Sequence, residues 1–180
     1  MARLPDPRPS FSPEAQEIYD RLLAKRGRID GMYLSMLNHP ELTRQVGALG
    51  TYLRFGEGAL PDDLRELTIL WLARKLKASY EWVKHFPYAQ KAGVPDAVLE
   101  AIRQGKKPSG LRAELQLALQ VADCVLEKRS IPAPVQDALA AVVGLAGVVE
   151  LVVLCGFYEM IAGVIFAFDV PLPPGEEEPF

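Results

Sequence analysis

An apolar run in the last third of the chain restricts most strongly what this sequence can fold into. Residues 138–168 read ALAAVVGLAGVVELVVLCGFYEMIAGVIFAF, which is long enough to cross a bilayer as one helix. Two acidic side chains, Glu150 and Glu159, lie inside the run, and a carboxylate within a membrane is costly. No basic residue follows Arg129, so the usual charged anchor is missing. We therefore expect a helix buried at the centre of a bundle or at a subunit interface.

The same run predicts self-association. Apolar residues are nearly continuous from 148 to 154, so one neighbouring helix cannot cover every side of this segment. A second copy of the chain would complete the burial, with closed symmetry as the usual outcome. We expect a homo-oligomer.

Length, charge and cysteine content narrow the class of protein. The chain has 180 residues, 49% of them apolar, which suits one globular domain spanning residues 1–180. Its formal net charge of -3 gives no electrostatic basis for binding nucleic acid. Cys124 and Cys155 match no metal-ligand or redox spacing and are expected to be buried thiols. With no secretory signal in MARLPDPRPSFS, a cytoplasmic location and no membrane partner are expected.

Helical signals follow one another along the whole chain, and no segment has a convincing strand pattern. Ser12 and Pro13 predict a helix start before residues 14–26, and Asn38 with Glu41 resembles a capping box for residues 40–55. Further helices are predicted near 62–76, 80–92, 96–104, 109–128, 134–143 and 147–168. The tail 171–180 has the composition of a disordered end. The sequence therefore predicts an all-α bundle.

Glu81 and His85 form the first candidate for chemistry. They are four residues apart in SYEWVKH, so on a helix they share a face. A carboxylate beside an imidazole can hold its tautomer and raise its pKa, which prepares a general acid or base. The same spacing also occurs on ordinary solvated helix faces. Tyr80 and Trp82 bring aromatic rings to this turn, for packing or for ligand contact.

Residues 65–105 read RELTILWLARKLKASYEWVKHFPYAQKAGVPDAVLEAIRQG. This segment has a REL-type helix start, an AR pair and a YEW followed by a histidine, and with these features it resembles the carboxymuconolactone decarboxylase family. The resemblance extends over residues 38–170, because GFYEMIAGVIFAFDV is similar to the closing helix of the family. It implies an all-α bundle of the alkylhydroperoxidase D-like type, assembled as a trimer or hexamer with sites near subunit boundaries.

A peroxidase branch of the same superfamily uses a glutamate, a CxxC pair and a histidine. In this sequence those positions resemble Glu66, Ala78, Glu81 and His85, so both thiols are missing. Thiol-based peroxide reduction needs a reactive thiolate and a resolving cysteine. We therefore expect that the protein is not a peroxidase.

The decarboxylase resemblance implies a small carboxylated lactone as substrate and no cofactor. Loss of carbon dioxide leaves an enolate, which must be protonated. In this interpretation His85 donates the proton, Glu81 orients the imidazole and Glu66 completes a proton relay. The substrate carboxylate needs a cation, for which Arg54, Arg65 and Arg74 are candidates. No metal site is expected.

Two alternatives to a cofactor-free enzyme stay open. The chain could be a non-catalytic helical oligomer that binds a small molecule, or a membrane-associated protein that uses its apolar helix. A pocket containing Glu66, Glu81 and His85 favours an enzyme. Outward-facing side chains at these positions favour the binding protein, and solubility without detergent argues against the membrane protein.

Overall fold

The computed structural model describes residues 2–29, 31–56 and 58–180, and every regular element among them is helical. The predicted all-α class is confirmed. In chain order the elements are η1 (Arg8–Ser10), α1 (Pro13–Arg26), α2 (Gly31–Met36), α3 (Pro40–Phe55), α4 (Asp62–Leu76), α5 (Ser79–Lys91), α6 (Asp96–Arg103), α7 (Ala113–Leu126) and α8 (Ala133–Ala167).

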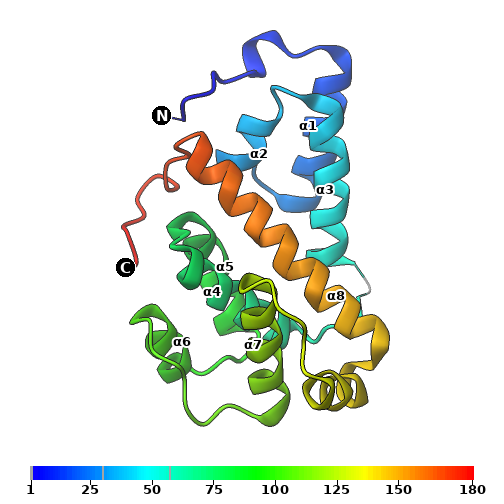
Figure 1. Ribbon diagram of the computed structural model, residues 1–180. Helices are drawn as coiled ribbons and strands as arrows, with labels where there is room; N and C mark the ends of the chain where they lie inside the picture. The colour runs from blue at the N-terminus through cyan, green and yellow to red at the C-terminus, as the bar shows by residue number, and fades with distance from the viewer. Residues whose placement is uncertain (1, 30, 57) are drawn as a thin grey trace.

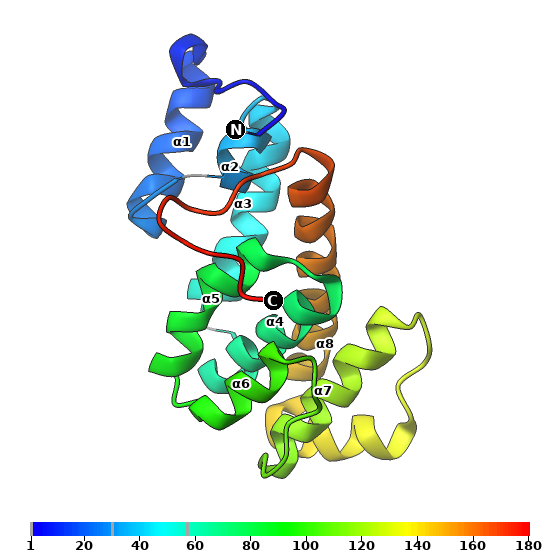
Figure 2. The same ribbon diagram turned by 90° about the vertical axis from the view of Figure 1, so that its left-hand side faces the viewer.

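Helix α8 runs obliquely through the molecule, with α1, α2 and α3 at one end and α4 to α7 at the other (Figure 1; Figure 2). Helix α4 is the most enclosed element and packs against α5, α6, α7 and α8. The apolar side chains Leu64, Leu67, Ile69, Leu70 and Leu72 are fully buried. Because these positions surround the helix axis, α4 is covered on every side, and this agrees with the wide apolar stripe in its sequence.

The apolar run forms one long element with an internal kink. Gly144 has φ 72° and ψ 170°, a non-helical conformation that joins two helical pieces within α8. Positive φ favours glycine because a Cβ atom would be strained there. The sequence prediction of two separate pieces thus locates the break correctly to within a few residues.

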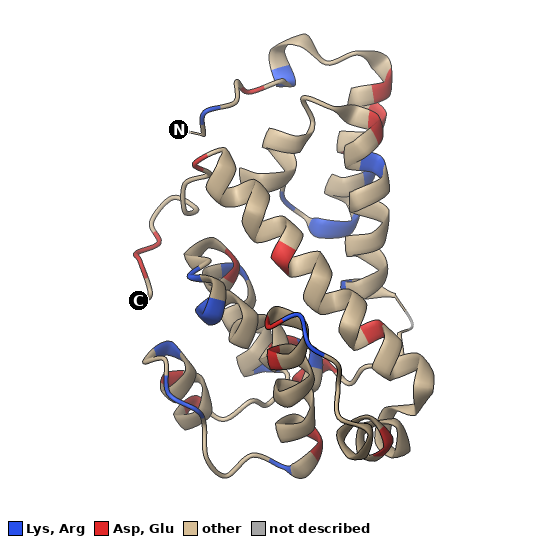
Figure 3. Cartoon of the chain, viewed as in Figure 1, with Lys and Arg blue, Asp and Glu red and all other residues tan. Residues whose placement is uncertain are grey.

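Helix α8 has the length and apolar composition of a membrane span, and about 44% of its most apolar window is buried inside the molecule. It carries almost no charge along its length (Figure 3). Two of its three acidic residues, Glu150 and Glu159, have partners. Glu150 is buried and its Oε2 accepts the Ala59 backbone N–H at 2.7 Å, while Glu159 pairs with Lys128. These contacts are typical of the core helix of a globular domain.

The helix starts show one correct and one wrong prediction. The Ser12 hydroxyl accepts the Ala15 backbone N–H at 3.1 Å and caps α1 as expected. The capping box at Asn38 is wrong, because His39 is the N-cap residue of α3 and its Nδ1 accepts the Leu42 N–H at 3.3 Å. Pro40 occupies the first helical position, which moves the cap to the residue directly before it.

The C-terminal tail has defined contacts in place of the expected disorder. It runs back along the molecule beside α5 (Figure 2). The Phe180 ring meets the Trp82 ring edge-on at 5.5 Å and lies 4.8 Å from the Arg74 guanidinium. Arg103 Nη1 donates to the Pro179 carbonyl at 3.0 Å. Cys124 and Cys155 are buried free thiols, as predicted.

Truncation of the α4 core should cost far more stability than truncation of an exposed leucine. Leu70→Ala removes a fully buried side chain and should lower the free energy of unfolding by about 2 to 5 kcal/mol. Leu42→Ala changes a side chain that is 49% exposed and should stay within about 0.5 kcal/mol of the wild type. Urea denaturation measures both. Equal losses would contradict the placement of α4 at the core.

Candidate active site

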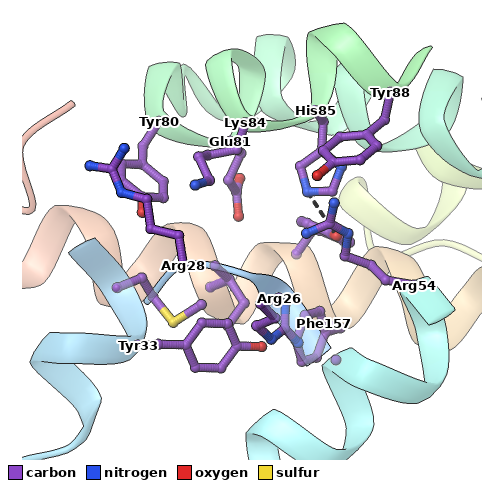
Figure 4. A pocket seen from close by; sticks show the side chains of 14 residues that line it. Arg26, Arg28, Tyr33, Arg54, Tyr80, Glu81, Lys84, His85, Tyr88 and Phe157 are labelled. Carbon is purple, nitrogen blue, oxygen red and sulfur yellow. Dashed lines mark hydrogen bonds between the residues drawn. The ribbon is translucent and has the colours of Figure 1, made fainter. Parts of the chain in front are cut away.

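A cavity lies between the N-terminal helices and the pair α5 and α8 (Figure 4). It opens to solvent, and its empty volume of about 690 Å³ includes that open mouth. Its lining side chains are Arg26, Arg28, Met32, Tyr33, Gly50, Arg54, Tyr80, Glu81, Lys84, His85, Tyr88, Phe157, Tyr158 and Ile161.

Helix α5 presents one face to this cavity. The connection from α4 is short because Lys77 adopts a left-handed conformation with φ 58°, and α5 begins at Ser79. Residues 81, 85 and 88 then follow at helical spacing, so their side chains point to the same side. Glu81 and His85 are both buried, at 3% and 4% exposure. The interpretation as a solvated helix face is therefore wrong.

Three helices supply a buried hydrogen-bonded chain centred on His85. Its Nδ1 lies 2.7 Å from Glu66 Oε2 on α4, and its Nε2 lies 3.0 Å from Tyr158 Oη on α8. The Tyr158 ring also packs edge-on against the imidazole, with the ring centroids 5.1 Å apart. His85 and Tyr158 line the cavity, whereas Glu66 is not one of the lining residues. The structure thus joins Glu66 to His85 directly.

Burial and hydrogen bonding together set the protonation of this chain. Burial lowers the pKa of His85, and its hydrogen bond to Glu66 offsets this only in part. Burial alone would raise the pKa of Glu66, but its bond to His85 and the nearby charges leave it below its ordinary value. An ionised Glu66 can only accept, so the neutral imidazole donates through Nδ1 and its Nε2 accepts the Tyr158 hydroxyl.

This result corrects the expected state of His85. A carboxylate partner was expected to raise the pKa of the imidazole above its usual range, but complete burial outweighs the partner. Burial also raises the pKa of Tyr158 well above its ordinary value, so the phenol keeps its proton. At neutral pH the group available at His85 is therefore a base, and the expected proton donor must be sought elsewhere.

Glu81 does not orient His85, contrary to the expectation from its spacing. Both of its carboxyl oxygens are buried and have no hydrogen-bond partner among the described residues. The carboxyl group points into the cavity between Lys84 and His85 (Figure 4). Burial raises the pKa of Glu81 well above its ordinary value, which favours the protonated, neutral form of this carboxyl group. The orienting carboxylate is Glu66, whose helix packs directly against α5.

The candidate substrate-binding residues divide into two groups. Tyr80 and Arg54 line the cavity. Trp82 and Arg74 lie outside it, because the helical turn directs Trp82 toward Phe86 and Phe180, and Arg74 donates to the Arg103 carbonyl at 3.0 Å.

Arg65 also lies outside the cavity and has acidic partners of its own. It pairs with Asp62 at 2.9 Å and with Glu66 at 3.2 Å, so of the three candidate arginines Arg54 alone is among the cavity residues. No cluster of histidine, cysteine and acidic side chains in the described parts of the chain could hold a metal ion.

Two residues central to the site were not found from the sequence. Tyr158 lies 73 residues from His85, within the apolar run, where a tyrosine is compatible with core packing. Arg26 ends α1 and resembles the basic residue that commonly closes a helix. A buried polar tip in an otherwise apolar helix was the signal available for Tyr158. Arg26 offered no comparable signal.

Comparison of the chain with protein-family models gave no match, and comparison with curated proteins gave none either.

Replacement of Glu81 should remove a pH dependence of stability. The folded pKa of Glu81 is raised, whereas in the unfolded chain it has a value of about 4.3. The folded state therefore holds the extra proton, so the contribution to stability is complete below pH of about 4 and is lost as pH rises toward the folded pKa. Relative to Glu81→Gln, the wild type should lose free energy of unfolding between acidic and neutral pH.

Urea denaturation of both proteins at several pH values measures this difference. Glu14→Gln, which changes an exposed carboxylate at the start of α1, is the matched control and should follow the wild-type pH dependence. Parallel curves for the wild type and Glu81→Gln would show that Glu81 is ionised in the folded protein.

Proposed function

We propose that the protein is a cofactor-independent acid–base enzyme that decarboxylates, or moves a proton within, a small carboxylated lactone or related carbonyl compound. The observation that supports this most is the pairing, in one cavity, of a neutral carboxylic acid with a neutral imidazole. Glu81 has an unpartnered buried carboxyl group, and His85 is held by Glu66 at 2.7 Å. Environments that push the pKa values of neighbouring groups apart are typical of acid and base pairs.

The two groups have complementary roles in this mechanism. The Glu81 O–H donates a hydrogen bond to the carbonyl oxygen of the substrate and stabilises the enolate that forms. In a proton transfer, His85 Nε2 takes up the proton through the Tyr158 hydroxyl, which is hydrogen-bonded to the imidazole and, like it, belongs to a cavity-lining residue. Glu66 holds the imidazole tautomer and stabilises the charge that develops on it.

Decarboxylation uses Glu81 as the acid and needs no base. The bond between carbon and the carboxylate breaks, and its electron pair moves into the carbonyl group to form the enolate. Glu81 then transfers its proton to the carbon and recovers one from water through the mouth of the cavity. The substrate releases carbon dioxide and gains one proton, so atoms and charge balance without an added oxidant or reductant.

The family resemblance enters this proposal as support. Glu66, Glu81 and His85 lie on two adjacent helices, α4 and α5, within the segment that resembles carboxymuconolactone decarboxylases, and we propose the alkylhydroperoxidase D-like type of bundle. Ala78 and Glu81 occupy the positions of the peroxidase thiols, which argues against peroxide reduction. We also propose a cytoplasmic location.

We further propose that the chain forms a closed homo-oligomer, a trimer or hexamer by resemblance, through an exposed stripe on α8. Large apolar side chains on its outer face follow one another at intervals of three, four, four, seven and six residues, and are 41% to 71% exposed. They are Val142, Leu145, Val149, Val153, Met160 and Phe166. A continuous uncharged stripe of this length is unusual on a soluble monomer, and a second copy would bury it.

Loss of the imidazole should abolish turnover and leave the fold intact. A panel of small lactone and keto carboxylates, assayed for carbon dioxide release and for proton exchange, should contain a substrate. His85→Ala should lower kcat/KM by about 10² to 10⁴, the usual share of a general base. Lys91→Ala, at the exposed end of α5, should retain wild-type activity.

The pH profile distinguishes the roles of the two groups. His85 must be neutral, so activity should fall below a pH lower than about 6.5, because its pKa is lowered. Glu81 must be protonated, so activity should also fall at the raised pKa of its carboxyl. Glu66→Gln should move the acid limb to lower pH. A loss of less than about tenfold in His85→Ala would place the chemistry elsewhere, and binding without turnover would favour the non-catalytic binding protein.

Charges placed in the α8 stripe should disrupt the proposed oligomer. The chain purified without detergent should scatter light as a single closed oligomer, and the double variant Leu145→Glu with Val149→Glu should be monomeric, because it would bury unpaired carboxylates at the contact. Gln136→Glu, at an exposed position of α8 outside the stripe, is the control. A stable wild-type monomer at micromolar concentration would contradict the proposal.

A further inference from the structure

Every buried side-chain oxygen or nitrogen that lacks a hydrogen-bond partner in the described residues belongs to a residue lining the cavity. These atoms are Arg26 Nε and the two carboxyl oxygens of Glu81. Buried polar groups in folded proteins are almost always paired, and an unpaired one costs stability. Their concentration in one cavity indicates a ligand that supplies the missing partners, an acceptor for Arg26 and a carbonyl-type oxygen for the Glu81 acid.

Arg26 is held in place by aromatic packing and lacks a counter-charge. Its guanidinium lies 4.3 Å from the centroid of the Tyr33 ring, and its Nη2 makes a long contact of 3.5 Å with Thr51 Oγ1. No carboxylate of the described residues lies within ion-pair distance of it. A planar guanidinium stacked on a ring keeps its N–H edge available for an anion.

Arg54 provides a second cation of the same kind. Its guanidinium lies 4.6 Å from the Tyr88 ring and 4.9 Å from the Phe55 ring, and it too has no acidic partner in the described part of the chain. The Phe55 ring is also 5.7 Å from Arg26. Burial, together with the positive charge of Arg54, lowers the pKa of Arg26. Two neighbouring cations that repel one another in a cavity are relieved by an anion.

Gly50 makes the close approach of these groups possible. A Cβ atom at this position would lie 2.6 Å from Tyr33 Oη, 2.8 Å from Phe157 Cζ and 3.2 Å from Arg26 Nη2. Any larger residue would push the guanidinium or the rings away. The cavity wall formed by α3 is therefore shaped around Arg26.

We propose that Arg26 and Arg54 form an anion subsite that binds a carboxylate of the substrate, while a carbonyl oxygen of the same molecule accepts the Glu81 proton. This inference rests on the proposed function and deepens it, because it assigns a keto or lactone carboxylate as the substrate class. A carboxylate matches the two-pronged edge of a guanidinium. Arg26 precedes residues 38–170, so the N-terminal helices supply a determinant of specificity that lies outside the family-like segment.

Levulinate is a suitable probe, because it carries one carboxylate and one ketone. Its binding to the full chain can be followed by NMR or calorimetry, with methyl levulinate as the uncharged control. Levulinate should bind, and methyl levulinate should bind at least about tenfold more weakly, as expected for loss of a charge-assisted contact. Arg26→Gln should weaken levulinate binding by a similar factor, and Arg54→Gln should weaken it in the same direction.

Two variants separate a lost contact from a damaged fold. Arg26→Lys keeps the charge without the planar fork and should fall between the wild type and Arg26→Gln. Arg21→Gln, on the exposed side of α1 where Arg21 pairs with Glu17 at 2.6 Å, should bind as the wild type does. Thermal melting of each variant identifies any that unfolds, and Arg54→Gln then tests the subsite if Arg26→Gln does not fold.

The outcomes for subsite and chemistry are distinct. A failure to find any turnover leaves the subsite standing if Arg26 still controls levulinate binding. Equal affinity of the wild type and Arg26→Gln for levulinate overturns the subsite, as does the absence of levulinate binding to the wild type. Tight binding of inorganic phosphate with the same dependence on Arg26, and no binding of levulinate, overturns the assignment to a carboxylate.

Discussion

Burial of α8 is the constraint on which the arrangement of the site depends. The inner face of this apolar helix packs against α4 and α7 and contacts α2 and α3. Because it passes between the two halves of the bundle (Figure 1), its inner face reaches the α5 imidazole, where Tyr158 meets His85. The same packing brings Phe157 beside the N-terminal helices. The force that stabilises the core thus also assembles the cavity wall.

Within this apolar surrounding, two carboxylates on adjacent helices take opposite states. Glu66 has a hydrogen-bonded imidazole and nearby cations, which outweigh its burial and keep it ionised. Glu81 is buried without any such partner, so burial alone decides its state and keeps it protonated. The difference arises from partners and not from residue type. In the proposed chemistry this difference makes Glu81 the acid and Glu66 the acceptor that holds the His85 imidazole, although the two carboxyl groups have the same intrinsic pKa.

Much of the fold could be predicted from local pattern. The helix at residues 13–26, its serine cap, the short break before Ser79 and the burial of both cysteines all follow from signals within a few residues, and the structure confirms them. The prediction for the C-terminal tail failed because it depended on neighbours distant in sequence. The polar and proline-rich composition of residues 171–180 predicts disorder, yet Phe180 packs against the Trp82 ring on α5.

In the candidate site, too, local sequence signals predicted some features and contacts between distant residues decided the others. Helical spacing alone placed Glu81 and His85 on one face of α5, because an α-helix has 3.6 residues per turn and positions four apart therefore lie on the same side. Spacing could not decide which carboxylate the imidazole would bind, whether that face would be buried, or which cation would share the cavity. Tertiary packing decided all three, since it joined His85 to Glu66 and Tyr158 across three helices and brought Arg26 to the same cavity. Charge state depends on burial and on partners, and both are properties of the packed molecule that no local stretch of sequence contains.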